Sequence, residues 1–510
     1  MTSVPPPNLY ALFQARFPRE NGALFLDIDD PAGHVPYDAI DTETGRLQAW
    51  LAELGVAKGD RVLVQVEKSP LAILLYLACL RRGAIYVPLN TAYTTEEVAY
   101  FLDDAAPRVL VCDPAREAAL APVAARAGVT HVRTLGADGD GSVGAYRQCA
   151  PDSAIAACAT DDTAAILYTS GTTGRSKGAM LSHANLAANA LTLHHVWRWV
   201  PGDVLLHALP IFHAHGLFVA LHCALLNGSR VRLVSGFDAA RVVALLRDAT
   251  VFMGVPTHYT RLLAEPTLDD AACGGMRLFL SGSAPLLAST HRAFTARTGH
   301  QILERYGMTE AGMITSNPYD GPRIPGCVGP GLPGVDTRVV DDQGRECRRG
   351  DAGTLEIRGP NVFTGYWRMP ERTAEEFRSD GFFITGDLAT MADDGRVTLV
   401  GRAKDLIISG GFNVYPKEIE TALDALPGVY ESAVIGLPHP DFGEGVTAVV
   451  VPEAGAHLVE AALIAALSDT LARFKQPKRV FVVAELPRNA MGKVQKAALR
   501  TQLADTYGGA

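Results

Sequence analysis

The strongest constraint on the fold is a repeated alternation of short apolar strands with amphipathic helices. The first run predicts a strand at 60–67, a helix at 69–83, a strand at 84–90, a helix at 94–105 and a strand at 108–113. The same rhythm returns between 203 and 280. Strands joined through helices form parallel sheets with helices on both faces. We therefore expect an α/β fold whose large N-terminal part contains two stacked α/β subdomains.

The pattern changes after Gly326, where short strands separated by Gly and Asp predict a small antiparallel, β-barrel-like unit. From Lys404 onward, helices and strands of a different order predict a small α+β domain, with a helix expected at 461–473. We place the boundary near 401–405. This gives a large N-terminal domain at 1–401 and a small C-terminal domain at 402–510.

Charge and cysteine content narrow the function classes. The chain of 510 residues has 46 Lys and Arg against 55 Asp and Glu, which argues against nucleic acid or an anionic membrane as the main partner. Its eight cysteines form no CxxC pair, as expected for free thiols in a reducing compartment. The apolar run 71–80 is too short to span a bilayer, and residues 1–17 resemble no targeting segment. We expect a cytoplasmic protein, and its oligomeric state stays open.

The segment YTSGTTGRSKG at 168–178 is rich in glycine and hydroxyl groups and follows an apolar strand. Backbone N–H groups and hydroxyls in such a loop suit a polyphosphate, because glycine lets the backbone approach closely. The spacing is neither that of a Walker A loop nor that of a dinucleotide-binding loop. On composition alone, a mobile surface loop remains an equal alternative.

Six segments in order resemble the signature motifs of the acyl-adenylate-forming (ANL) superfamily, which includes acyl-CoA synthetases, luciferases and peptide-synthetase adenylation domains. They are YTSGTTGRSKGAMLSH (168–183), SGSAPL (281–286), RYGMTE (305–310), ITGDL (384–388), GRAKDLIISGGFNVYPKEIE (401–420) and PRNAMGKVQK (487–496). The resemblance implies a ligase that joins a carboxylate to ATP, giving acyl-AMP and pyrophosphate. The acyl group then passes to the thiol of CoA.

The resemblance also implies the nucleotide site. Glu310 and Thr172 would bind Mg²⁺, since a carboxylate and a hydroxyl suit a hard cation. Asp387 would bind the ribose, and Arg402 would make a second ribose or phosphate contact. The residues implied for ATP and AMP are Thr169, Ser170, Gly171, Thr172, Thr173, Gly174, Lys177, Ser283, Ala284, Tyr306, Gly307, Thr309, Asp387 and Arg402.

Catalysis and domain rotation are implied by the same matches. Lys493 matches the lysine that reaches the carboxylate and the α-phosphate during adenylation, and a flexible point charge suits a residue that must arrive and leave. Lys404 matches the hinge of the small domain, where the superfamily also carries aspartate. Gly410 and Gly411 match the segment beside the pantetheine channel. The implied catalytic set is Lys493, Thr309, Glu310 and His215.

The acyl pocket points to a short dicarboxylic acid. FHAHGLFVA, MGVPTHYTRLL and ERYGMTEAGMITSNPYDG look most like malonyl-CoA synthetases, in which an arginine of the second segment holds the distal carboxylate. Ile314 and His258 depart from that pattern and leave the choice between malonate and methylmalonate open. The residues implied for the substrate carboxylates are Arg261, His215, Ser281, Gly282 and Met313.

We therefore expect malonyl-CoA synthesis from malonate, ATP and CoA with Mg²⁺ as the metal. A synthetase for methylmalonate, acetate or another short acid is the nearest alternative. A luciferase-like monooxygenase and a non-enzymatic ATP-binding regulator are alternatives from other classes. A polar acyl pocket argues against the first, and the intact Lys493, Glu310 and Lys177 argue against the second.

Overall fold

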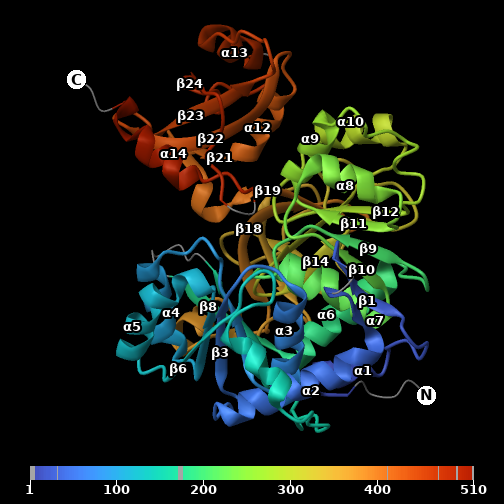
Figure 1. Cartoon of the computed structure of the whole chain (residues 1–510). Coiled ribbons are helices and arrows are strands. Elements are labelled where there is room, and N and C mark those ends of the chain that lie inside the picture. Colours follow the sequence, from blue (N-terminus) through green and yellow to red (C-terminus); the bar gives the residue numbers. More distant parts are fainter. Residues whose placement is uncertain are drawn as a thin grey trace.

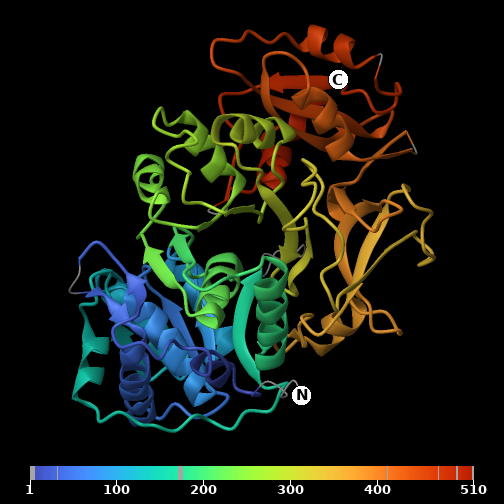
Figure 2. The same cartoon turned by 90° about the vertical axis from the view of Figure 1, so that its right-hand side faces the viewer.

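The computed structural model describes residues 6–30, 33–169, 176–410, 412–468, 470–489 and 492–507. Two sheets with their helices and an antiparallel unit make up the lower body in Figure 1, and the segment from β20 onward packs above it. Figure 2, turned by 90°, shows the antiparallel unit beside the two sheets and below this segment. Among the described helices, none combines the length and apolar character needed to cross a membrane.

The first sheet has seven strands in the order β17-β8-β7-β4-β3-β5-β6. Strands β7, β4, β3, β5 and β6 pair in parallel, whereas β8 pairs antiparallel with β7 and with β17. The strands are β3 (Arg61–Gln65), β4 (Ile85–Pro88), β5 (Val109–Cys112), β6 (His131–Thr134), β7 (Thr163–Thr169), β8 (Lys177–Ser182) and β17 (Gly365–Tyr366).

The second sheet has eight strands in the order β14-β13-β12-β11-β9-β10-β1-β2, with parallel pairing from β13 to β1. The strands are β1 (Leu24–Asp27), β2 (Val35–Pro36), β9 (Val204–His207), β10 (Arg230–Leu233), β11 (Val251–Gly254), β12 (Leu278–Ser281), β13 (Leu303–Met308) and β14 (Gly312–Ser316). These two sheets confirm the expected pair of α/β subdomains.

Helices cover and join the two sheets. Helices α1, α2, α3, α6 and α7 contact one another, and one hydrophobic core connects them to strands of both sheets. The helices of this body are α1 (Leu9–Gln14), α2 (Tyr37–Glu53), α3 (Pro70–Arg82), α4 (Thr95–Ala105), α5 (Glu117–Arg126), α6 (His183–Val196), α7 (Leu221–Asn227), α8 (Ala239–Leu246), α9 (Pro256–Ala264), α10 (Ala288–Thr298) and α11 (Pro370–Glu375). A π-helical turn, η4 (His215–Ala220), precedes α7.

The expected barrel-like unit is a four-stranded antiparallel sheet of β15 (Asp336–Val340), β16 (Gly353–Arg358), β18 (Phe383–Met391) and β19 (Val397–Arg402). The C-terminal segment has its own five-stranded sheet and two hydrophobic clusters made only of its own residues. Its elements are β20 (Ile407–Ser409), β21 (Phe412–Val414), α12 (Pro416–Asp424), β22 (Val429–His439), β23 (Gly443–Pro452), α13 (Glu460–Leu467), β24 (Arg479–Val482) and α14 (Lys496–Gln502).

Local sequence signals explain several helix ends. The Ser69 side chain accepts a bond from the amide of Ala72 at the start of α3, and Gly83 ends that helix with φ 70°. Thr94 and Glu97 form a capping box at the start of α4. The prediction of a helix to 473 was wrong, because α13 ends at Leu467. The Ser468 hydroxyl bonds to a backbone carbonyl there, which competes with helical pairing.

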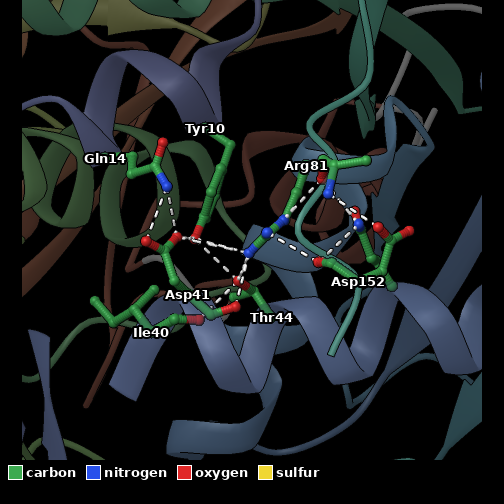
Figure 3. A network of polar contacts seen from close by, with 9 residues as sticks. Tyr10, Gln14, Ile40, Asp41, Thr44, Arg81 and Asp152 are labelled. Carbon is green, nitrogen blue, oxygen red and sulfur yellow. Dashed lines mark hydrogen bonds and ion pairs between the residues drawn. The ribbon is translucent and has the colours of Figure 1, made fainter. Parts of the chain in front are cut away.

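A buried arginine ties α1, α2 and α3 to the segment at 152–154 (Figure 3). Arg81 is 2% exposed, and its side chain donates to the carbonyls of Asp41, Asp152 and Ala154 at 2.7–3.0 Å. It also donates to the Thr44 hydroxyl at 3.0 Å. Every polar group in this network has a partner, so it fixes the relative positions of the three helices.

Removing this guanidinium should weaken the fold. Arg81→Met would leave buried carbonyls without donors, so we expect a loss of about 3–5 kcal/mol in the free energy of unfolding. Urea denaturation measures it. Arg82→Met is the control, because the adjacent arginine donates to the carbonyl of Val56 and lies only partly buried. Equal losses in both variants would contradict this role for Arg81.

Candidate active site

Asp387, Arg402 and Tyr306 form a compact cluster between the second sheet and the antiparallel unit. Asp387 on β18 and Arg402 on β19 are register partners, and the Arg402 Nε lies 2.6 Å from Asp387 Oδ1. The Tyr306 hydroxyl, from β13, donates to Asp387 Oδ2. Burial and the adjacent Asp387 raise the pKa of Tyr306 well above its usual value, so the phenol stays protonated. The cluster presents an oriented carboxylate suited to two vicinal hydroxyls.

Lys177 and Glu310 meet around the side chain of Tyr366. The Lys177 Nζ lies 2.8 Å from Glu376 Oε1 and 4.0 Å from the centre of the Tyr366 ring. The Tyr366 hydroxyl lies 3.1 Å from Glu310 Oε1 and 2.7 Å from Glu376 Oε2. Glu310 is 7% exposed, and burial raises its pKa although Tyr366 and Lys177 act in the opposite direction.

The donor set around Glu310 fits Mg²⁺ bound together with phosphates. Thr309 and Glu310 offer hard oxygen ligands at the turn after β13. Among the described residues, no cluster of three His, Cys, Asp or Glu side chains could hold a metal alone. Mg²⁺ uses few protein carboxylates and completes its shell with water and phosphate oxygens, so a single carboxylate here fits that ion.

A polar cluster lies where the residues after β12 meet the start of η4. Ser283 has φ 71°, a strained value for a residue with a side chain, and its Oγ lies 3.2 Å from His215 Nδ1. Within the part of the chain that the structure describes, His215 Nε2 and the Ser281 hydroxyl are buried without a hydrogen-bond partner. Burial, followed by the charge of Arg305, lowers the pKa of His215 well below its usual value, so its imidazole is neutral.

Arg305 is the buried cation of this site. The residue is 3% exposed, and its Nε and Nη2 have no hydrogen-bond partner among the described residues. A side chain at Gly282 would collide with its guanidinium, because a Cβ there would lie 1.8 Å from Nη1. Burial lowers the pKa of Arg305 to about 9. A buried guanidinium with free donors is arranged to receive an anion.

The loop that carries Lys493 packs against α9. A Cβ at Gly492 would lie 3.0 Å from the Thr257 Oγ1, which puts the small C-terminal segment in contact with the start of α9. Burial and Arg402 lower the pKa of Lys493, whereas Asp387 and Glu310 raise it. Lys493 nevertheless has solvent-exposed surface. Lys493 therefore lies within electrostatic reach of the Asp387 cluster and of Glu310.

Two family models cover most of the chain. The model described as AMP-binding enzyme matches residues 13–367, and the model of its C-terminal domain matches 418–493. The chain belongs to the AMP-binding enzyme family. The resemblance to the adenylate-forming superfamily is thereby confirmed.

Curated relatives and solved structures agree with this assignment. The ATP-bound MatB of Rhodopseudomonas palustris has a TM-score of 0.95 and 54% identity, covering 98% of this chain and 100% of that chain. The mitochondrial malonate–CoA ligase ACSF3 of Mus musculus is 36% identical over 90% of this chain and 84% of its own length. A sulfoacetate–CoA ligase of Cupriavidus necator is 35% identical, over 92% of each chain.

The structure of this AMP-binding enzyme gathers many of the expected site residues. Thr169 and Lys177 are register partners on β7 and β8, and Gly307 faces Met313 across β13 and β14. Arg261 on α9 is exposed and forms no ion pair with any described residue. Gly410 occupies the turn between β20 and β21 with φ 59°. Ser170, Gly171, Thr172, Thr173, Gly174 and Gly411 lie outside the described residues.

Our sequence analysis missed Arg305, Tyr366 and Glu376. Arg305 precedes Tyr306 in the RYGMTE motif, and alternation along β13 places it on the face opposite to Tyr306. That alternation was the available signal. Tyr366 and Glu376 lie about 190 positions from Lys177 in the chain, and no local pattern marks them.

Proposed function

We propose that this AMP-binding enzyme is a malonyl-CoA synthetase, which converts malonate, ATP and CoA into malonyl-CoA, AMP and pyrophosphate through malonyl-AMP. The observation that carries the proposal is the buried Arg305. Its Nε and Nη2 have no hydrogen-bond partner among the described residues, so they are available to bind an anion at the proposed acyl site. A monocarboxylate with an apolar tail would leave that charge unpaired, at a cost of several kcal/mol. The malonate–CoA ligases among its relatives support the same acid.

In the first half-reaction, one malonate carboxylate attacks the α-phosphorus of ATP and pyrophosphate leaves. We propose that Lys493 neutralises the attacking carboxylate and the α-phosphate, because two anions must approach each other. Asp387, with Arg402, holds the ribose, and Tyr306 orients Asp387. Thr309 and Glu310, with Thr172, would hold Mg²⁺, and the bound ion would supply positive charge next to the phosphates.

At the acyl site, Ser281, Gly282, His215 and Met313 surround the malonate in this proposal. Arg305 holds the distal carboxylate from the β13 side, and Arg261 approaches it from α9. The absence of a side chain at Gly282 gives the guanidinium of Arg305 its space. The neutral His215, held by Ser283, offers Nε2 to the substrate without adding a competing charge.

In the second half-reaction, the CoA thiolate attacks the acyl carbon and AMP leaves. We propose that the chain divides at 401/402 and that the C-terminal part turns about Lys404 to bring Gly410 and Gly411 beside the pantetheine chain. The separate hydrophobic clusters of the C-terminal part support this division. Lys404 is exposed, in the 3₁₀ turn Ala403–Asp405 after β19.

Locking this turn should separate the two half-reactions. Lys404→Pro fixes φ where the chain must rotate, so we expect adenylation within about tenfold of wild type but thioester formation lowered at least tenfold more. Pyrophosphate release without CoA and malonyl-CoA formation from supplied malonyl-AMP measure the two steps. Lys404→Ala, which keeps backbone freedom, is the control. Equal losses in both steps would show that the position is only structural.

The test of the function is a panel of acids scored by pyrophosphate release, with and without CoA. Malonate should give the highest kcat/KM, and methylmalonate, acetate, butyrate and sulfoacetate define the breadth of the site. A preference for butyrate over malonate would overturn the proposal.

We also propose a cytoplasmic location, which the eight free cysteines support. Cell fractionation tests it.

A further inference from the structure

Glu376 joins the lysine of the phosphate loop to a second cation. Its Oε1 lies 2.8 Å from Lys177 Nζ and 2.7 Å from Arg372 Nη2. The side chains of Lys177 and Glu376 are 11% and 15% exposed, so their pairing is only partly weakened by solvent. In this structure Lys177 therefore already has a protein carboxylate as its counter-ion.

Tyr366 connects this carboxylate to Glu310. Its hydroxyl carries one proton, yet it lies 2.7 Å from Glu376 Oε2 and 3.1 Å from Glu310 Oε1. One O–H group cannot donate fully to both carboxylates at once. A tyrosine phenol is protonated at neutral pH, so the hydroxyl has one proton to donate. The hydroxyl must divide its hydrogen bonding between the two acids.

We propose that Glu376 is a placeholder for the ATP phosphates at Lys177 and that Tyr366 links this exchange to Glu310. When the triphosphate arrives, Lys177 leaves Glu376 for the phosphate oxygens. Tyr366 then donates fully to Glu376 and releases Glu310 Oε1 for the metal. The inference rests on the proposed adenylation function and makes Tyr366 and Glu376 positioning residues.

Arg372 and Tyr366 stabilise the Glu376 carboxylate when Lys177 leaves it. A buried carboxylate that lost its only cation would carry a penalty of several kcal/mol. Arg372 remains 2.7 Å from Glu376 Oε1 after Lys177 leaves, and Tyr366 gains a stronger bond to Oε2. The Tyr366 ring lies 4.0 Å from Lys177 Nζ and supports the ammonium with its π face.

The first test measures nucleotide binding alone, by calorimetry in EDTA without acid or CoA. Glu376→Gln removes the competing charge while keeping the shape, so metal-free ATP should bind roughly tenfold tighter. AMP should bind as to wild type, because Lys177 serves the polyphosphate. Glu375→Gln is the matched control: this neighbouring acid is exposed and pairs only with Arg372 among the described residues.

The outcomes separate this proposal from the proposed function. Unchanged or weaker ATP binding in Glu376→Gln, or equal effects in both variants, would overturn the placeholder. Glu376→Asp keeps the charge and should stay within threefold of wild type, which guards against a loss caused by misfolding. Because no acid is present, a wrong assignment of malonate would leave these titrations unaffected.

A double-mutant cycle tests the link through Tyr366. Tyr366→Phe removes a hydrogen-bond donor from Glu376, so the ion pair between Glu376 and Lys177 becomes stronger. Metal-free ATP should therefore bind about threefold more weakly. In the Glu376→Gln background the same change should alter ATP binding by less than 1.5-fold. Additive effects would show that Tyr366 acts independently and would overturn the link.

Discussion

Lys493→Ala should abolish formation of malonyl-AMP while largely sparing thioester formation from supplied malonyl-AMP. The ammonium lies within electrostatic reach of Asp387 and Glu310 in this structure, where we propose that the attacking carboxylate and the α-phosphate meet. Removing one well-placed charge from such a transition state lowers the rate by on the order of 10²–10³ or more. Pyrophosphate exchange measures the first step, and malonyl-CoA formation from malonyl-AMP measures the second.

A matched control tests whether the loss of adenylation is specific to Lys493. Lys475, also on the C-terminal part, pairs with Glu418 at 2.6 Å on the surface. Lys475→Ala removes a similar charge from the same part of the chain and should leave adenylation within about twofold of wild type. Adenylation at wild-type speed in Lys493→Ala would refute the assignment. Equal loss of both half-reactions would assign Lys493 to folding or docking instead.

The largest change in substrate preference is expected from Arg305. Arg305→Leu removes the partner of the distal carboxylate, so kcat/KM for malonate should fall by about 10²–10⁴. The value for butyrate should fall less or rise, because an unpaired guanidinium no longer opposes an apolar tail. Without ligand, Arg305 is a buried charge lacking partners, so the variant should also unfold at a higher temperature.

Two further substitutions separate the role of Arg261 from that of Arg305. Arg261→Leu should lower kcat/KM for malonate with no gain in stability, because this side chain is exposed. Arg292→Leu, on the exposed side of α10, is the control and should change neither quantity. If malonate and butyrate lose equally in Arg305→Leu, the guanidinium only supports the fold. If Arg261→Leu costs less than threefold, that residue lies outside the substrate site.

Local chemistry made most of the fold and the nucleotide site predictable. The alternation of strands and helices predicted both parallel sheets, and Ser69, Gly83 and the Thr94 capping box define helix ends. The motif at 168–178 and RYGMTE marked the phosphate and adenylate residues. Each of these signals is contained within a few neighbouring residues, so it can be recognised without knowledge of the tertiary fold.

The charge balance of the site was decided only by the tertiary structure. Glu376 meets Lys177 across 199 positions, and Tyr306 reaches Asp387 across 81. The sequence singled out Arg261 on an amphipathic helix, but whether an arginine is buried depends on which elements close around it. Arg305 is the buried cation because the backbone just after β12 brings Gly282 against it, and the missing side chain there leaves space for the guanidinium. Sequence sets which groups are present, whereas packing sets which of them are left unpaired for a substrate.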